Sequence, residues 1–137
     1  MTQENKDLLL KDLCARLPYG MKAQVCERND EDGSYFYNDC KILGFRDNSL
    51  VEFIRIDDLG KEYGRSDWFN ISWFKPYLFP MPDIQNKSLD ELDKLITNKK
   101  FYEITNIGQD YFNTHHFDYR ELIPKGLAID ATNLNIY

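Results

Sequence analysis

The stretch Cys40-Lys-Ile-Leu-Gly-Phe-Arg-Asp-Asn-Ser-Leu-Val-Glu-Phe-Ile-Arg-Ile56 decides the class of fold. It contains two runs rich in β-branched and aromatic residues, which favour strands. The pair Asp47-Asn48 between them favours a tight turn of the kind that joins antiparallel strands. We therefore predict a β-hairpin, with one strand over residues 35–46 and the next over Leu50–Ile56.

An amphipathic helix is expected before this hairpin. Four leucines recur at helical spacing near the start of the chain: Leu9, Leu10, Leu13 and Leu17. Charged residues, Arg16 among them, fall on the other faces of the same helical projection. The sequence Leu17-Pro-Tyr-Gly20 is typical of a helix end followed by a turn. We predict a helix over residues 3–16.

Further strands are expected on both sides of the hairpin. Residues 21–25 alternate between apolar and polar side chains, which indicates a half-buried strand. Residues 66–74 form an aromatic run, and Lys75-Pro76 is expected to end regular pairing. Short strands at such spacing predict a compact antiparallel β-meander or a small SH3-like barrel over residues 20–80.

The remaining chain has a helical pattern. Ser88-Leu-Asp-Glu91 has the spacing of a capping box, which predicts a helix start. Residues 110–115 favour a second short helix, residues 101–107 fit a strand or a helix equally, and residues 127–137 are expected to be extended. The prediction is one α+β domain over 1–137: a helix over 1–17, the sheet or small barrel over 20–80, and a helical C-terminal part with an extended tail over 83–137.

Composition narrows the classes of partner. The chain of 137 residues has 23 Asp and Glu against 17 Lys and Arg, a formal net charge of −6. An acidic domain repels phosphate backbones and anionic membranes, so we expect neither nucleic-acid nor membrane binding. The start of the chain lacks a signal-peptide pattern, and no apolar run reaches the length of a membrane span, so a cytoplasmic protein is expected. Its three cysteines are then expected to be free thiols.

Both histidines lie in the segment Asn113–Gly126, which first suggests a catalytic or metal site. Asp118 and Glu121 have the spacing of a helix cap, with Asp118 as the N-cap residue. Phe117 and Leu122 stand at the positions of a hydrophobic staple around that cap. We therefore predict that most of this segment is structural.

A catalytic alternative remains for the same segment. His116, Asp118 and Arg120 combine a base, a carboxylate and a cation, which a small enzyme could use. A helical zinc site is not expected, because its two histidines would stand four residues apart and His115 and His116 are adjacent. No phosphate-binding or nucleophile-elbow motif is present, so neither a metal nor another cofactor is predicted.

The aromatic run Trp68-Phe-Asn-Ile-Ser-Trp-Phe74 offers a possible binding surface. If it is one continuous strand, Phe69, Ile71 and Trp73 share a face that is predicted to be core. The other face carries Trp68 and Phe74, and it mixes polar with aromatic side chains. We take Trp68, Phe74 and Tyr77 as candidate binding residues of an aromatic groove; the alternative is that this face packs under the terminal helices.

Three strings of the sequence are distinctive: residues 11–20, residues 75–81 and residues 116–130. They resemble an uncharacterised family of small proteins from Bacteroides-type gut bacteria and their phages. The resemblance implies a commensal-genome or mobile-element setting and implies no reaction. Members of that family often carry Gly at the position of Glu121.

Three functions are weighed from these observations. The leading expectation is a non-enzymatic protein-interaction domain of a phage or mobile-element protein. The first alternative is a small enzyme that uses His116, Asp118 and Arg120. The second is an acidic inhibitor of a host nucleic-acid-binding or defence protein, because an acidic surface can imitate a nucleic acid.

Overall fold

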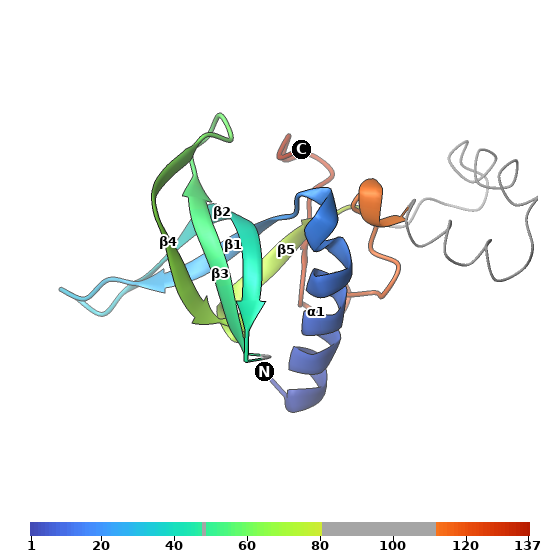
Figure 1. Ribbon diagram of the computed structural model, residues 1–137, viewed down its shortest axis with the longest axis horizontal. Helices are drawn as coiled ribbons and strands as arrows, with labels where there is room; N and C mark the ends of the chain where they lie inside the picture. The colour runs from blue at the N-terminus through green and yellow to red at the C-terminus, as the bar shows by residue number, and fades with distance from the viewer. Residues whose placement is uncertain (48, 81–111) are drawn as a thin grey trace, which may run out of the picture.

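The computed structural model describes residues 1–47, 49–80 and 112–137. In this part of the chain, one helix packs against a six-stranded, mostly antiparallel sheet, so the predicted α+β class is confirmed (Figure 1). The helix α1 spans Gln3–Arg16, as predicted. The hydroxyl of Thr2 caps it by accepting a hydrogen bond from the amide of Asn5. A short 3₁₀ helix, η1 (Leu17–Tyr19), follows.

The predicted hairpin forms the centre of the sheet. Strands β2 (Tyr35–Arg46) and β3 (Leu50–Ile56) pair antiparallel with the predicted bounds. Strand β1 (Lys22–Arg28) pairs with the other side of β2, and its inward residues Ala23 and Val25 are buried. The strand order is β4-β3-β2-β1-β5-β6, an open sheet in which no ladder among the described residues joins the two ends.

The next strand differs from the prediction for residues 66–74. Strand β4 spans Glu62–Asn70, so it begins earlier and ends four residues sooner. A 3₁₀ turn, η2 (Ile71–Trp73), interrupts the run. The break starts at Asn70, whose side-chain oxygen accepts hydrogen bonds from the amide and the hydroxyl of Ser72. Such local bonds compete with a strand ladder.

Pairing also continues through Pro76. Strand β5 spans Phe74–Leu78 and runs antiparallel to β1, with Pro76 opposite Ala23. The prediction that Lys75-Pro76 ends pairing is therefore wrong. Proline has no amide hydrogen to donate to a neighbouring strand. The ladder between β5 and β6 involves only Tyr77 and Leu78, so Pro76 removes no bond from it.

The C-terminal segment completes the sheet. Strand β6 (Ile129–Asp130) lies parallel to β5. Residues 112–114 are helical, but residues 122–126 form turns where the cap at Asp118 predicted a helix. The predicted helix start at Ser88 and the open question at residues 101–107 lie outside the described residues.

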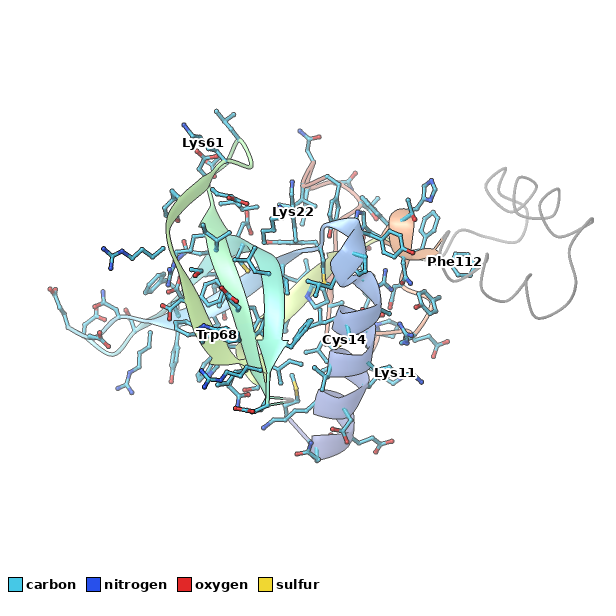
Figure 2. All side chains as sticks on the ribbon, viewed as in Figure 1. Lys11, Cys14, Lys22, Lys61, Trp68 and Phe112 are labelled. Carbon is cyan, nitrogen blue, oxygen red and sulfur yellow. The ribbon has the colours of Figure 1, made fainter. Side chains whose placement is uncertain are left out.

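The core fills the space between α1 and the sheet. Leu9 and Leu13 of α1 are fully buried there. Phe53 of β3 meets Phe69 of β4 and Phe74 of β5 edge to face, with ring centroids 5.0 and 5.2 Å apart. The sheet therefore curls enough for β4 and β5 to share one aromatic contact. On the opposite side of α1, Lys11 is exposed and points away from the sheet (Figure 2).

Candidate functional site

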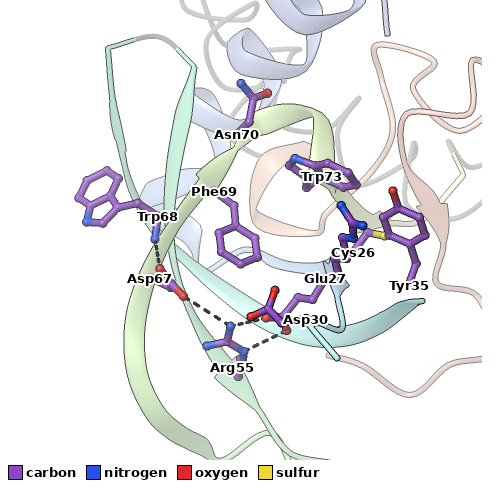
Figure 3. A pocket seen from close by; sticks show the side chains of 11 residues that line it. Cys26, Glu27, Asp30, Tyr35, Arg55, Asp67, Trp68, Phe69, Asn70 and Trp73 are labelled. Atoms are coloured by element: carbon purple, nitrogen blue, oxygen red, sulfur yellow. Dashed lines mark hydrogen bonds and ion pairs between the residues drawn. The ribbon is translucent and has the colours of Figure 1, made fainter. Parts of the chain in front are cut away.

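A groove of about 680 Å³ opens between the β1–β2 hairpin and the end of β4 (Figure 3). The hairpin contributes residues 26–28, Asp30 and Tyr35, and β3 contributes Arg55. Residues 67–70 at the end of β4 and Trp73 of η2 complete the lining. We call this site the aromatic groove. It joins segments that are distant in sequence, and the curl of the sheet is what brings them together.

Aromatic rings form much of its surface. The rings of Tyr35 and Trp73 stack, with 6.0 Å between centroids and 23° between planes. Tyr35 is 57% exposed and Trp73 is 42% exposed. Phe69 lies between Trp73 and the floor of the groove, whereas the ring of Trp68 lies at the rim on the outer side of β4 (Figure 3). A contiguous exposed surface of aromatic rings, unlike a single exposed ring, can mark a binding site.

The turn η2 explains why Trp73 is exposed. A continuous strand would place Phe69, Ile71 and Trp73 on one buried face. Ile71 is indeed 1% exposed. The 3₁₀ turn, however, shifts the alternation of inward and outward side chains, so Trp73 points outward and Phe74 points into the core at 0% exposure. The prediction that Trp73 is a core residue is therefore wrong.

The same change of phase affects the candidate binding residues Trp68, Phe74 and Tyr77. Phe74 and Tyr77 are buried, and only Trp68 borders the groove. The hydroxyl of Tyr77 donates to the carboxylate of Asp39. Burial, and then this carboxylate, raise the pKa of Tyr77 well above its ordinary value.

An ion pair forms the floor of the groove. Glu27 is 7% exposed and accepts two hydrogen bonds from the guanidinium of Arg55, one of them from Nε at 3.0 Å. Asn38 donates a third to the same carboxylate. Burial alone would raise the pKa of Glu27, but the bonds from Arg55 and Asn38 outweigh it and lower the pKa. This pair links β1 to β3 across the face of β2.

Asp118 has a structural role that differs in detail from the predicted one. Its carboxylate accepts from the amides of Leu122 and Ile123 at 2.7 and 2.9 Å, which holds a turn rather than a helix start. Glu121 does not complete a capping box, because it is exposed and has a backbone φ of 59° in the left-handed region. The predicted capping box at this position is therefore wrong.

The other two residues of the catalytic alternative have separate partners. Arg120 donates to Asp12 of α1 at 2.9 Å. The ring of His116 stacks on Tyr137, with 3.7 Å between centroids. Burial of His116, followed by the positive charge of Arg16, lowers its pKa to about 4. Within the described residues, no hydrogen bond or ion pair joins His116, Asp118 and Arg120.

A buried charge network at α1 was not anticipated. Arg16, expected on an exposed face, is fully buried together with Asp12. Its Nε donates to Asp12 at 2.7 Å and its Nη2 donates to the carbonyl of Phe117 at 2.6 Å. Asp12 therefore binds two guanidinium groups, and α1 is tied to residues 117–120. The spacing of Asp12 and Arg16, four apart on a helix, was the available signal.

The three distinctive strings of the sequence meet at this network. Residues 11–20 contribute Asp12 and Arg16, and residues 116–130 contribute their partners. Phe79, within residues 75–81, exchanges backbone hydrogen bonds with His116 and Asp118 at 2.8 Å each. They form a structural junction that lies apart from the residues lining the aromatic groove.

Comparison with protein-family models, with curated proteins and with solved structures gives no significant match. Among the described residues, no helix is long and apolar enough to cross a membrane. The same part of the chain contains no group of three or more His, Cys, Asp or Glu side chains placed to hold a metal ion. The three cysteines, Cys14, Cys26 and Cys40, are free thiols.

Proposed function

We propose that this chain is a protein-interaction domain that binds its partner through the aromatic groove. The observation that carries the proposal is the exposed stack of Tyr35 on Trp73 at the wall of a groove of about 680 Å³. Tyrosine and tryptophan supply large contact areas with few rotatable bonds, and they are enriched where proteins meet.

The wider setting belongs to the same proposal. A phage or mobile-element origin rests on the resemblance of three strings of the sequence alone, and a cytoplasmic location rests on the sequence patterns. The proposal of a small SH3-like barrel is supported by the curl of the sheet, in which β5 pairs with β1 after η2 and Phe69 and Phe74 both contact Phe53.

A second candidate, the acidic inhibitor of a nucleic-acid-binding or defence protein, has one observation in its favour. The turn between β1 and β2 carries Asp30, Glu31 and Asp32, all exposed, at the tip of the hairpin. A row of carboxylates on a projecting arm can imitate phosphates. This candidate would require competition with nucleic acid for one basic partner.

Selection from a library of displayed random peptides tests the leading proposal. The full chain serves as bait, and each selected peptide is measured again on two variants. Tyr35→Ser with Trp73→Ser removes the aromatic stack. Leu59→Ser is the matched control, since Leu59 is 94% exposed on the turn between β3 and β4 and does not line the groove.

We expect the selected peptides to bind the wild type and the Leu59→Ser protein equally and to lose affinity for the double variant. Circular dichroism on all three proteins checks that the folds are intact. Peptides that bind the double variant as well as the wild type would contradict the proposal, and so would the absence of any enriched peptide.

A further inference from the structure

Negative charge gathers around the aromatic groove. Asp30 lines its hairpin side, Asp67 lines its β4 side and Glu27 lies at its floor. Glu31 and Asp32 continue the acidic turn at the hairpin tip. The residues that line the groove comprise three carboxylates and two cations, Arg28 and Arg55, a formal charge of −1. With Glu31 and Asp32 at the hairpin tip, the region reaches −3 of the formal net charge of −6.

The two arginines neutralise only part of this charge. Arg55 is committed to Glu27 in a two-bond ion pair, and it lies 3.6 Å from Asp67. Arg28 lies back over its own turn, with its guanidinium next to Gly33. A Cβ built on Gly33 would lie 3.3 Å from Nη2 of Arg28. Within the described residues, Asp30 has no ion-pair partner. The carboxylates of Asp30 and Asp67 thus line opposite sides of the groove, and that of Asp30 is not neutralised by an ion pair.

Aromatic faces next to carboxylates favour a cation over other ligands. The negative face of an indole attracts an ammonium or guanidinium group, and a carboxylate nearby adds to that attraction. From this arrangement we infer that the aromatic groove binds a lysine or arginine side chain from a basic, extended segment of a partner protein. The inference rests on the proposed function and names the chemistry of the partner.

Recognition is expected to come from side chains rather than from strand addition. Strand β4 is bulged just before the groove, because its register with β3 shifts between the pairs Phe53–Asp67 and Arg55–Tyr63. The amide of Trp68 is also already bound, since it donates to the carboxylate of its neighbour Asp67 at 2.9 Å. A bulge and an occupied donor both disfavour pairing with another strand.

Titration with short peptides followed by NMR tests the inference on the full chain. The probes are heptapeptides with blocked ends, rich in Gly and Ser, with three lysines or three arginines. Matched probes carry glutamine or glutamate at the same three positions. The readout is the pair of indole N–H signals, because the chain has two tryptophans and Trp73 lies in the groove.

We expect the lysine and arginine probes to shift the Trp73 indole signal in a saturable way and the glutamine and glutamate probes to leave it unchanged. Raising the ionic strength should weaken binding, because salt screens exposed charges. Asp30→Asn and Asp67→Asn should each weaken binding about two- to fivefold, the size of an exposed ion pair. Asp58→Asn, an exposed carboxylate on the turn between β3 and β4, is the control without effect.

Each other outcome overturns the inference. Equal binding of the glutamine probe would mean that binding does not depend on a positive charge. Preferred binding of the glutamate probe would mean that Arg28 makes the groove an anion site. No shift with any probe would also contradict it. If the peptides selected for the proposed function still need Tyr35 and Trp73 but carry no basic residue, the inference fails and the proposed function stands.

Discussion

The ring of Tyr35 lies stacked on the ring of Trp73, with 6.0 Å between the centroids, and this contact joins the start of β2 to the end of η2. The next residue, Phe74, turns the other way and is fully buried against Phe53. Two adjacent aromatic residues thus serve opposite purposes. One forms the wall of an open groove and the other fills the core.

Substitution of these two neighbours should have very different costs. Phe74→Ala should lower the free energy of unfolding by about 3–5 kcal/mol, because it leaves a cavity in the core. Trp73→Ala removes one exposed aromatic pair and should cost about 0.5–1.5 kcal/mol. Urea denaturation measures both values. Equal costs would mean that Trp73 belongs to the core after all.

Removal of the carboxylate of Asp12 should destabilise the fold strongly. Asp12→Ala leaves the buried guanidinium of Arg16 and that of Arg120 without their shared partner, so we expect a loss of about 3–5 kcal/mol. Asp7→Ala, on the exposed face of the same helix, is the control and should stay within about 0.5 kcal/mol of wild type. Thermal unfolding of the two variants gives the comparison. Similar melting temperatures would show that the network at Asp12 contributes nothing to stability.

Glycine should be a better residue than glutamate at position 121. Glu121 is exposed with a φ of 59°, a conformation that costs an L-residue about 1–2 kcal/mol and costs glycine little. Glycine loses about 0.5–1 kcal/mol of that advantage through its larger freedom when unfolded. Glu121→Gly should therefore raise the free energy of unfolding by about 0–1.5 kcal/mol in a urea titration.

Gly126→Ala is the converse test of the same turn. Gly126 has a φ of 73°, so an alanine there should lower the stability by about 1 kcal/mol. A destabilised Glu121→Gly protein beside an unaffected Gly126→Ala protein would contradict the described backbone of this segment.

His116 should make the fold less stable in acid. Burial lowers its pKa from 6.5 to about 4, so the unfolded chain binds a proton more readily than the folded one within that range. Its contribution to the free energy of unfolding is fully present above pH 6.5 and is lost progressively as the pH falls toward 4. Stability curves of wild type and His116→Phe should converge or cross as the pH falls. Curves that stay parallel from pH 7 to pH 4 would contradict the burial of this ring.

The helix and the strands with a regular pattern of apolar and polar residues could be predicted from the sequence. The leucine spacing before Pro18 defines α1, and the turn at Asp47 defines β2 and β3, because in these segments local preference and burial agree. The run from Ser66 to Phe74 was misread for a physical reason. The hydrogen bond from Ser72 to Asn70 forms a 3₁₀ turn, which shifts the alternation of inward and outward side chains at Trp73 and Phe74. The pattern of apolar and polar residues does not reveal such a turn.

Most of the groove could not be predicted, since its residues are distant in the sequence. The pairing of β1 with β2 places Tyr35 near Glu27, and the ion pair with Glu27 brings in Arg55 from β3. Arg16 was assigned to solvent because long charged side chains are rarely buried without a partner. Its partners, Asp12 on the same helix and the carbonyl of Phe117 far along the chain, reverse that expectation.

Fluorescence quenching of Trp73 tests the central claim most directly. In a Trp68→Phe protein, Trp73 is the single tryptophan, and the neutral quencher acrylamide reports its accessibility with and without a peptide selected on the wild-type chain. An open aromatic groove that binds a partner predicts efficient quenching in the free protein and clear protection once the peptide is bound. A Trp73 that is protected in the free protein, or equally accessible in the presence of saturating peptide, would contradict it.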